Sequence, residues 1–260
     1  MTNATAFVTG ASRGLGEAIV RTLIQSGFSS VIAVSRSQNA SLESIAAEHG
    51  ANIEWVSTDL GSEEETVRNL GPVFDRYTAG SANPVVLVNN AGAIEPIAPL
   101  GTVDSREIAG NLRVNLTAPA LLCNEFLRAF ETTDSRRVIV NITSGLARRA
   151  MTGVASYSAA KAGLEMFTAA IALEQSRRSG DEHGAAPPVE VYAVSPGTVA
   201  TDMQSALRAS SESEFPDRSR FVSLYERGEL YTPEYSSRRI VDFILKPKLP
   251  SGSVVHVRDL

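Results

Sequence analysis

Short runs of β-branched and apolar residues alternate along the chain with longer segments in which apolar residues recur at helical spacing. The runs expected to form strands are 6–9, 30–34, 53–56, 85–88, 137–142, 189–194 and 253–257. The segments expected to form helices are Leu15–Gln25, Ser41–Glu48, Glu63–Tyr77, Ser105–Phe130, Ser156–Arg178 and Pro233–Leu245. Strands that alternate with helices are typical of a parallel sheet, and runs that are apolar throughout indicate strands covered on both faces. The pattern therefore predicts an α/β protein with a doubly wound parallel sheet of about seven strands and helices on both faces.

Two polar segments interrupt this alternation. Residues 179–188 end in two prolines and are expected to form an exposed loop. Residues 203–230 mix charged and apolar side chains between a strand and the last helix, and a connection of this length is more often a functional lid than filler. Because no linker divides the series, we expect a single domain over residues 1–260, with residues 203–230 as its substrate lid.

Composition and charge exclude several classes of protein. Of the 260 residues 43% are hydrophobic, which suffices for a large core, and the net charge of −5 disfavours a nucleic-acid partner. Cys123 is the only cysteine, and the three histidines lie far apart without the spacing of a metal site. No apolar run approaches the roughly 18 residues of a membrane span, and the first residues do not resemble a signal peptide. We therefore expect a cytoplasmic protein without a metal, membrane or nucleic-acid partner.

A glycine-rich turn follows the first expected strand and opens the first expected helix. Its sequence is Thr9-Gly10-Ala11-Ser12-Arg13-Gly14-Leu15-Gly16. Glycines let the backbone turn tightly and approach a pyrophosphate, while the N–H groups and dipole of a helix N-terminus favour the anion. The spacing G-x-x-x-G-x-G, in its strand–turn–helix context, predicts a dinucleotide-binding Rossmann fold.

The end of the second expected strand indicates which dinucleotide is bound. A carboxylate there would accept a hydrogen bond from a ribose 2′-hydroxyl, whereas an arginine suits a 2′-phosphate. This chain has Ser35 and Arg36 at that place and no carboxylate, and Arg13 lies in the glycine turn. Although single surface arginines are usually just solvated, two at these positions predict NADP(H) as the cofactor.

Tyr157 and Lys161 lie four residues apart on one face of an expected helix. A nearby ammonium favours a phenolate, so we expect the pKa of Tyr157 to fall below its ordinary value of about 10. Tyr157 is then a candidate general acid for a carbonyl that receives a hydride, and Ser144, at the end of the fifth expected strand, is placed to bind the same oxygen.

Taken together, these motifs resemble the short-chain dehydrogenase/reductase family over nearly the full chain. The matching positions are 9–16, Asp59-Leu60, Asn89-Asn90-Ala91-Gly92, Asn115, Ser144, Tyr157, Lys161 and Pro196-Gly197. The catalytic residues that the resemblance implies are Asn115, Ser144, Tyr157 and Lys161, with Asn115 holding a water in a proton relay from Lys161. The cofactor-binding residues that the turn, Arg36 and the resemblance indicate are Gly10, Ser12, Arg13, Gly14, Leu15, Gly16, Ser35, Arg36, Asp59, Leu60, Asn90, Ala91, Gly92, Tyr157, Lys161, Pro196, Gly197, Val199 and Thr201.

Within the family, the second half of the chain most resembles the sepiapterin reductases and the related benzil reductases. That resemblance implies an NADPH-dependent reductase of a vicinal diketone or α-hydroxyketone. The residues expected to contact substrate are Ser144, Leu146, Met151, Val154, Tyr157, Met203 and Leu207, a largely apolar set that could equally be core. A pterin-binding aspartate near the C-terminus is replaced by His256, or by Asp259 in another register. Arg148 and Arg149 either attract an anionic substrate or are solvated.

Two further functions stay open on the sequence. One is a 3-oxoacyl-thioester reductase of the same fold, and the other is a catalytically idle NADP-binding regulatory protein. The complete set of catalytic residue types argues against the idle protein. The resemblance also implies a homodimer or homotetramer that associates through 105–130 and 156–178, where Ala159, Ala162, Ala169 and Ala170 would permit close helix approach.

Overall fold

The computed structural model describes residues 2–78, 82–181 and 187–260. Its central element is a seven-stranded sheet in the order β3-β2-β1-β4-β5-β6-β7, and every adjacent pair of strands is parallel. The strands are β1 (Thr2–Thr9), β2 (Phe28–Val34), β3 (Asn52–Val56), β4 (Val85–Asn89), β5 (Arg137–Ile142), β6 (Glu190–Ser195) and β7 (Val254–His256). The predicted doubly wound parallel sheet is therefore confirmed, and each expected strand is present.

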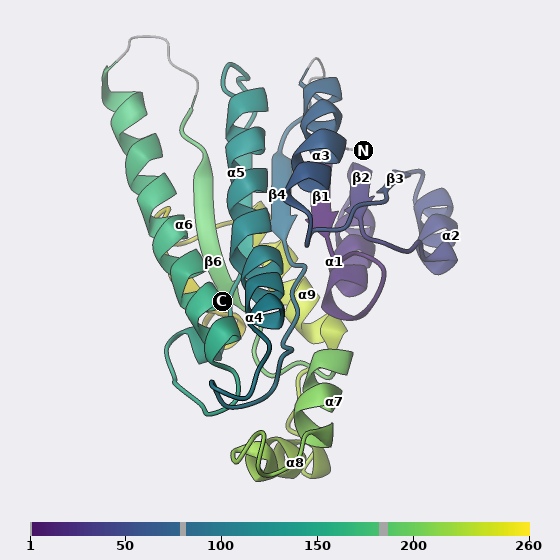
Figure 1. Cartoon of the computed structure of the whole chain (residues 1–260). Helices are drawn as coiled ribbons and strands as arrows, with labels where there is room; N and C mark the ends of the chain where they lie inside the picture. The colour runs from purple at the N-terminus through teal and green to yellow at the C-terminus, as the bar shows by residue number, and fades with distance from the viewer. Residues whose placement is uncertain (1, 79–81, 182–186) are drawn as a thin grey trace.

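Helices cover both faces of the sheet. One face carries α1 (Gly14–Gln25), α2 (Ala40–Glu48) and α9 (Pro233–Leu245). The other carries α3 (Glu63–Arg76), α5 (Ala118–Ala129) and α6 (Ala155–Asp181), which stand in front of the sheet in Figure 1. Each helix turns its apolar stripe toward the strands, so the two faces of the sheet form two separate cores. In the part of the chain described here, every helix falls short of the length and hydropathy that a membrane crossing requires.

Side chains of β1 alternate between the two cores, as the period of a strand requires. Val8 packs with α1 and α9, whereas Phe7 faces α3 and α5. The ring of Phe7 lies 4.8 Å from that of Phe74 and 6.4 Å from that of Phe126, edge to face in both cases. These contacts hold the strand that carries the glycine turn between two layers of helices.

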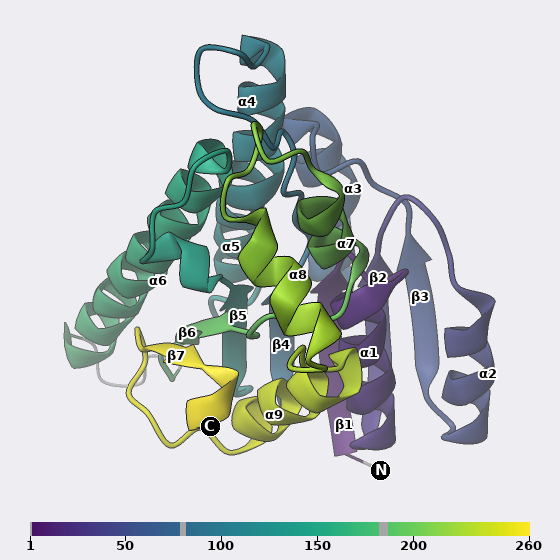
Figure 2. The same cartoon turned by 90° about the horizontal axis from the view of Figure 1, so that it is seen from below.

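The strand order places a crevice at the carboxyl ends of β1 and β4. The chain winds outward through β2 and β3, then returns to β4 on the other side of β1, so the connections after β1 and β4 leave in opposite directions. Such a reversal point is where ligands bind in open α/β sheets. Figure 2 shows α7 (Asp202–Ala209) and α8 (Arg218–Glu226) lying across this edge of the sheet.

Three expected segments differ in detail from the structure. The expected helix 105–130 consists of α4 (Ser105–Leu112), a π-helical turn at Arg113–Thr117 and α5. The loop expected at 179–188 begins later than predicted, because α6 continues to Asp181, and residues 182–186 lie outside the described part of the chain. The segment 203–230 contains α7 and α8, because Leu207 and Phe221 supply each helix with a buried apolar anchor.

Candidate active site

A cleft of about 1090 Å³ opens at the carboxyl-terminal edge of the sheet. It is bordered by the segments that follow β1, β2, β3, β4, β5 and β6, together with α7 and α8. Every residue that the sequence assigns to the cofactor lines this cleft: Gly10, Ser12, Arg13, Gly14, Leu15, Gly16, Ser35, Arg36, Asp59, Leu60, Asn90, Ala91, Gly92, Tyr157, Lys161, Pro196, Gly197, Val199 and Thr201. The structure therefore brings together positions that lie up to 191 residues apart, from Gly10 to Thr201.

The glycines of the first turn are required by backbone geometry. Gly10 has a φ of +67° and Gly14 a φ of +57°, a region that other residues rarely adopt. A Cβ on Gly16 would lie 2.0 Å from the carbonyl oxygen of Gly10, so α1 can begin so close to β1 only with glycine at that position. The turn thus keeps its backbone at the floor of the cleft, with the N-terminus of α1 beside it.

Two arginines line the end of the cleft beyond β2. Arg36 is exposed there, directly after Ser35, and no carboxylate stands at the end of the strand. Arg13 forms an ion pair with Asp202, the first residue of α7, so it joins the glycine turn to the segment after β6. Asp59 accepts a hydrogen bond from the Gly61 amide at 2.9 Å, which fixes its carboxylate at the cleft wall.

Tyr157 and Lys161 stand together on the first turns of α6 and are almost completely buried. Their residues are 4% and 3% exposed, and the Nζ of Lys161 lies 5.8 Å from the centre of the Tyr157 ring. Lys161 donates a hydrogen bond to the Ile142 carbonyl oxygen at 2.9 Å. Ser144 follows β5 and lies within hydrogen-bond reach of Tyr157. One end of the cleft therefore joins a phenol, a hydroxyl and an amine.

The expected direction of the Tyr157 pKa is wrong for this structure. Burial raises the pKa of Tyr157 to about 12, although its hydrogen bond with Ser144 acts in the opposite direction. Burial also lowers the pKa of Lys161 to about 8. Desolvation therefore determines the direction of the pKa shift of Tyr157, whereas the four-residue spacing led us to expect that the ammonium would determine it. A phenol with this pKa keeps its proton at neutral pH, which is the state that a general acid needs.

Asn115 is placed behind the cleft wall instead of on it. It lies in the π-helical turn, is fully buried, and donates from Nδ2 to the carbonyl oxygens of Ala93 at 2.8 Å and Asn111 at 2.9 Å. A Cβ on Gly92 would come within 2.9 Å of its Oδ1 and 3.7 Å of the Lys161 Nζ. Asn115 therefore holds the backbone after β4 close to Lys161 and supports the site from behind.

Most of the residues expected to contact substrate line the cleft beyond Tyr157. These are Ser144, Leu146, Met151, Met203 and Leu207, together with Tyr157 itself. Val154 is the exception and corrects the prediction: it has no exposed surface and packs behind the wall against Ile94 and Phe215. A sequence in which Met151 and Val154 are both apolar does not tell which of them faces the cleft.

Further residues line the cleft, and two of them, Tyr231 and Arg220, have no signal in the local sequence. Tyr231 enters the cleft because a bridge joins it to Val199, and its ring lies so close to Gly197 that a Cβ there would be 2.3 Å away. His256, at the end of β7, also lines the cleft, whereas Asp259 borders only a neighbouring cavity of about 380 Å³. Arg149 and Arg220 line the cleft as well.

No cluster of three or more His, Cys, Asp or Glu residues that could hold a metal occurs within 2–78, 82–181 and 187–260.

The burial of Lys161 gives protein stability a characteristic pH dependence. Its folded-state pKa of about 8 lies below the ordinary value of 10.5, so the unfolded chain binds more protons between these two values. The contribution of Lys161 to the free energy of unfolding therefore rises with pH from about 8 to about 10.5. Urea denaturation at a series of pH values should show this rise in the parent protein relative to a Lys161→Met variant. Equal pH slopes in the two proteins would contradict the depressed pKa.

Comparisons with known proteins fit this geometry. A family profile described as short chain dehydrogenase matches residues 4–212. A benzil reductase ((S)-benzoin forming) from Bacillus cereus is 30% identical over 250 residues, which cover 96% of this chain and 97% of that protein. The sepiapterin reductase of Bos taurus is 29% identical over 264 residues, which cover 97% of this chain and 93% of that protein.

A solved structure gives the same result for the fold. A protein from Beutenbergia cavernae, described as an NAD(P)-dependent gluconate 5-dehydrogenase with NADP bound at low occupancy, is 30% identical. The similarity extends over 99% of this chain and 96% of that one, with a TM-score of 0.76. The chain therefore belongs to the short-chain dehydrogenase family of oxidoreductases.

Proposed function

We propose that this protein is an NADPH-dependent carbonyl reductase that converts a ketone to an alcohol. The observation that carries the proposal is the meeting of Tyr157, Ser144 and Lys161 at one end of a cleft whose other end is formed by the glycine turn and Arg36. This arrangement provides a proton donor, a hydrogen-bond partner for the carbonyl oxygen and a cation in one place. The preferred substrates are vicinal diketones or α-hydroxyketones.

The residues of the cleft fit NADP(H). The glycine turn offers backbone amides at the N-terminus of α1 to a pyrophosphate, and Arg36 offers a guanidinium to a 2′-phosphate. A carboxylate at the end of β2 would repel that phosphate, but Ser35 and Arg36 occupy these positions. The Beutenbergia cavernae relative contains bound NADP. Pro196, Gly197, Val199 and Thr201 would enclose the nicotinamide end.

NADPH, when bound, supplies the hydride, and the protein supplies the proton. The carbonyl oxygen of the substrate accepts hydrogen bonds from Ser144 and from the phenol of Tyr157. As the carbonyl carbon receives the hydride, the Tyr157 proton moves to the carbonyl oxygen, the C=O π bond breaks and an alcohol forms. The ammonium of Lys161, held by the Ile142 carbonyl, stabilises the phenolate that remains.

The wall beyond Tyr157 suits a dicarbonyl with an apolar body. Leu146, Met151, Met203 and Leu207 present an apolar surface that extends from the proton donor. A second carbonyl next to the reacting one makes the ketone more electrophilic, so no metal is needed to polarise it. The Bacillus cereus and Bos taurus relatives are named for the reduction of benzil and sepiapterin.

The segment 203–230 is proposed to close over the substrate as the lid of a single domain. Its helices α7 and α8 contribute Met203, Leu207 and Leu224 to the cleft, and Phe221 and Phe215 anchor it to the apolar cluster below.

A 3-oxoacyl-thioester reductase is the second candidate activity, and the apolar wall alone accommodates its acyl chain equally well. Activity on benzil but not on an acetoacetyl thioester would separate the two. A cytoplasmic location stays a prediction.

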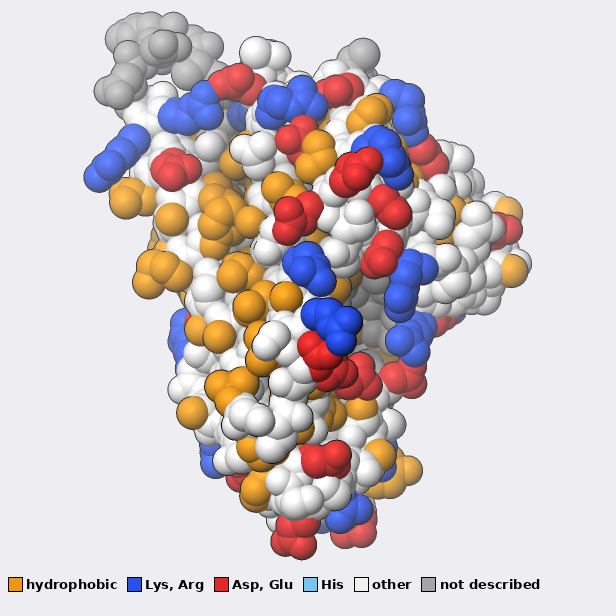
Figure 3. Space-filling model, in the orientation of Figure 1, with side chains coloured by type: hydrophobic (Ala, Val, Ile, Leu, Met, Phe, Trp, Pro, Cys, Tyr) orange, Lys and Arg blue, Asp and Glu red, His pale blue; other side chains and the backbone are white. Residues whose placement is uncertain are grey.

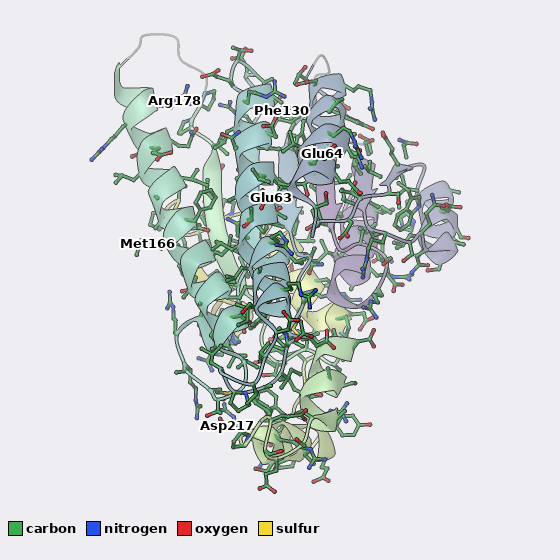
Figure 4. The ribbon with its side chains drawn as sticks, viewed as in Figure 1. Glu63, Glu64, Phe130, Met166, Arg178 and Asp217 are labelled. Atoms are coloured by element: carbon green, nitrogen blue, oxygen red, sulfur yellow. The ribbon has the colours of Figure 1, made fainter. Side chains whose placement is uncertain are left out.

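The outer face of α6 is proposed to join two copies of this chain. Met166 is 72% exposed and Leu173 is 53% exposed, and the exposed side of the same helix carries the alanines at 159, 162, 169 and 170. Figure 3 shows hydrophobic side chains gathered over α6 and its neighbour α5, and Met166 projects outward in Figure 4. An apolar face of this kind is costly in water and favours a covered interface.

Loss of the Tyr157 hydroxyl should abolish turnover without loss of cofactor binding. In a Tyr157→Phe variant we expect kcat with benzil to fall by roughly 100-fold or more, because general acid catalysis contributes about that much. The dissociation constant of NADPH, measured by fluorescence titration, should stay close to that of the parent. Tyr77→Phe, which removes a hydroxyl bonded to Glu54 away from the cleft, serves as the control. Substantial turnover by purified Tyr157→Phe would refute the assigned acid.

A carboxylate at position 36 should change the cofactor preference. Arg36→Asp places a negative charge where the 2′-phosphate is proposed to bind, so kcat/KM for NADPH should fall by about tenfold or more while NADH becomes a better substrate. Arg68→Asp makes the same change of charge on the exposed face of α3 and should leave the preference unaltered. An unchanged ratio of the two kcat/KM values in Arg36→Asp would rule out the role of Arg36.

A charge on the outer face of α6 should dissociate the proposed dimer. We expect the parent protein to have twice the mass of one chain by light scattering, and Met166→Arg to have the mass of one chain, because a guanidinium cannot be buried there without a partner. Val67→Arg, on the partly exposed surface of α3, should remain a dimer. A parent protein with the mass of one chain would contradict the proposal directly.

A further inference from the structure

The charge of the cleft is opposite to that of the protein. The chain as a whole carries −5, yet six cations and only three carboxylates line the cleft. Arg13, Arg36 and Lys161 belong to the cofactor and to the catalytic group proposed above. The remaining three cations that line the cleft are Arg149, Arg220 and Arg258. The proposed chemistry at Tyr157 gives them no role.

Arg149 differs from its neighbour in having no partner. Arg148 donates to the Glu165 carboxylate at 2.8 Å and lies in the smaller neighbouring cavity. Arg149 lines the main cleft between Leu146 and Met151, is exposed, and forms no ion pair or hydrogen bond with any residue that the structure describes. The two adjacent arginines therefore differ: Arg148 is held in an ion pair, whereas the guanidinium of Arg149 has no partner among the described residues.

Arg220 is likewise the unpartnered arginine of the lid. Arg208 stacks on the ring of Tyr225 at 3.9 Å, Arg218 donates to a backbone carbonyl at 2.7 Å, and Arg227 is paired with Glu229 at 2.8 Å. Arg220 has no such contact among the described residues, although it lines the cleft next to Phe221. Arg258 lies 3.6 Å from the Asp259 carboxylate and is thereby partly neutralised.

Two guanidiniums without a partner among the described residues thus line the cleft from different elements. Arg149 comes from the segment between β5 and α6, and Arg220 comes from α8. A guanidinium presents a planar fork of donors that matches the oxygens of a carboxylate or a phosphate. A neutral diketone would leave both cations without a counter-charge.

We propose that the substrate of this enzyme carries an oxyanion remote from the reacting carbonyl, and that Arg149 and Arg220 bind it. The inference rests on the carbonyl reductase function proposed above and names the class of its substrate: an anionic ketone with an apolar body between the two groups. A carboxylate and a phosphate share the required chemistry, and the two are distinguished by the substrates used in the test.

The test compares three substrates that differ only in the substituent at one ring position. These are benzil, benzil with a 4-carboxylate and benzil with a 4-phosphate ester, each measured by NADPH oxidation. We expect the better of the two anionic substrates to exceed benzil in kcat/KM by about 25-fold, through a lower KM, since each of the two charge-assisted contacts should contribute about fivefold, or about 1 kcal/mol. The preference should shrink as ionic strength rises.

Variants then assign the effect to the two arginines. Arg149→Gln and Arg220→Gln should each lose about fivefold in kcat/KM for the anionic substrate while benzil is turned over as before, and the double variant should show no preference. Arg68→Gln, an exposed arginine on α3, should behave like the parent. Unchanged turnover of benzil also shows that the variants are folded.

The outcomes separate this inference from the function on which it rests. If benzil is reduced but the anionic substrates have no advantage, or if their advantage survives in the double variant, the anionic substrate is refuted and the reductase stands. If none of the three ketones is reduced, the proposed function fails and the inference fails with it. The anion with the lower KM identifies the carboxylate or the phosphate as the natural group.

Discussion

The whole site depends on the close contact between the first turn and the backbone after β4. Asn90 donates from Nδ2 to the Thr9 carbonyl oxygen at 2.9 Å, and the Thr9 hydroxyl accepts from the amides of Asn90 and Ala91 at 2.9 and 3.0 Å. These hydrogen bonds can form only because Gly10 and Gly16 lack side chains, since a Cβ on either would come within 3.0 Å of Asn90 or Ala91 atoms. The crevice between β1 and β4 is therefore held open at a fixed width, with backbone amides at its floor.

Burial determines the protonation of two side chains at the other end of the cleft. The amine of Lys161 is fixed on the end of β5, and the phenol of Tyr157 is removed from water one helical turn away. Burial opposes charge on both groups, so the phenol keeps its proton and the amine loses affinity for its own. A charge that develops during the reaction would be felt strongly by both, because little water remains to screen it. The proton that Tyr157 is proposed to donate is thus retained at neutral pH because the phenol is buried.

The sequence predicts the parts of the site that depend on order along the chain. In a parallel sheet the carboxyl ends of the strands meet at one edge, so residues that follow successive strands, such as Ser12, Asn90 and Ser144, are brought together whatever their separation in sequence. It does not predict which side of a short apolar segment faces the cleft, and Val154, expected to contact substrate, lies behind the cleft wall. Tyr231 and Arg220 reach the cleft by tertiary packing of α8 and the following turn, for which no local pattern exists. The expected direction of the Tyr157 pKa shift is wrong because the spacing of two residues reveals that they are neighbours but not how deeply they are buried.

The π-helical turn between α4 and α5 sets the rotational phase of one helix relative to the other. A π turn closes its hydrogen bond over one residue more than an α turn does, which amounts to about 100° of rotation about the axis. Asn115 therefore points toward Gly92, while Leu122 and Phe126, about two and three turns later, still face the core beside Phe7. Deleting one residue from 113–117 would regularise the helix and turn one of these two faces away from its partner. A change in the length of this stretch would therefore disturb the site even if every side chain were kept.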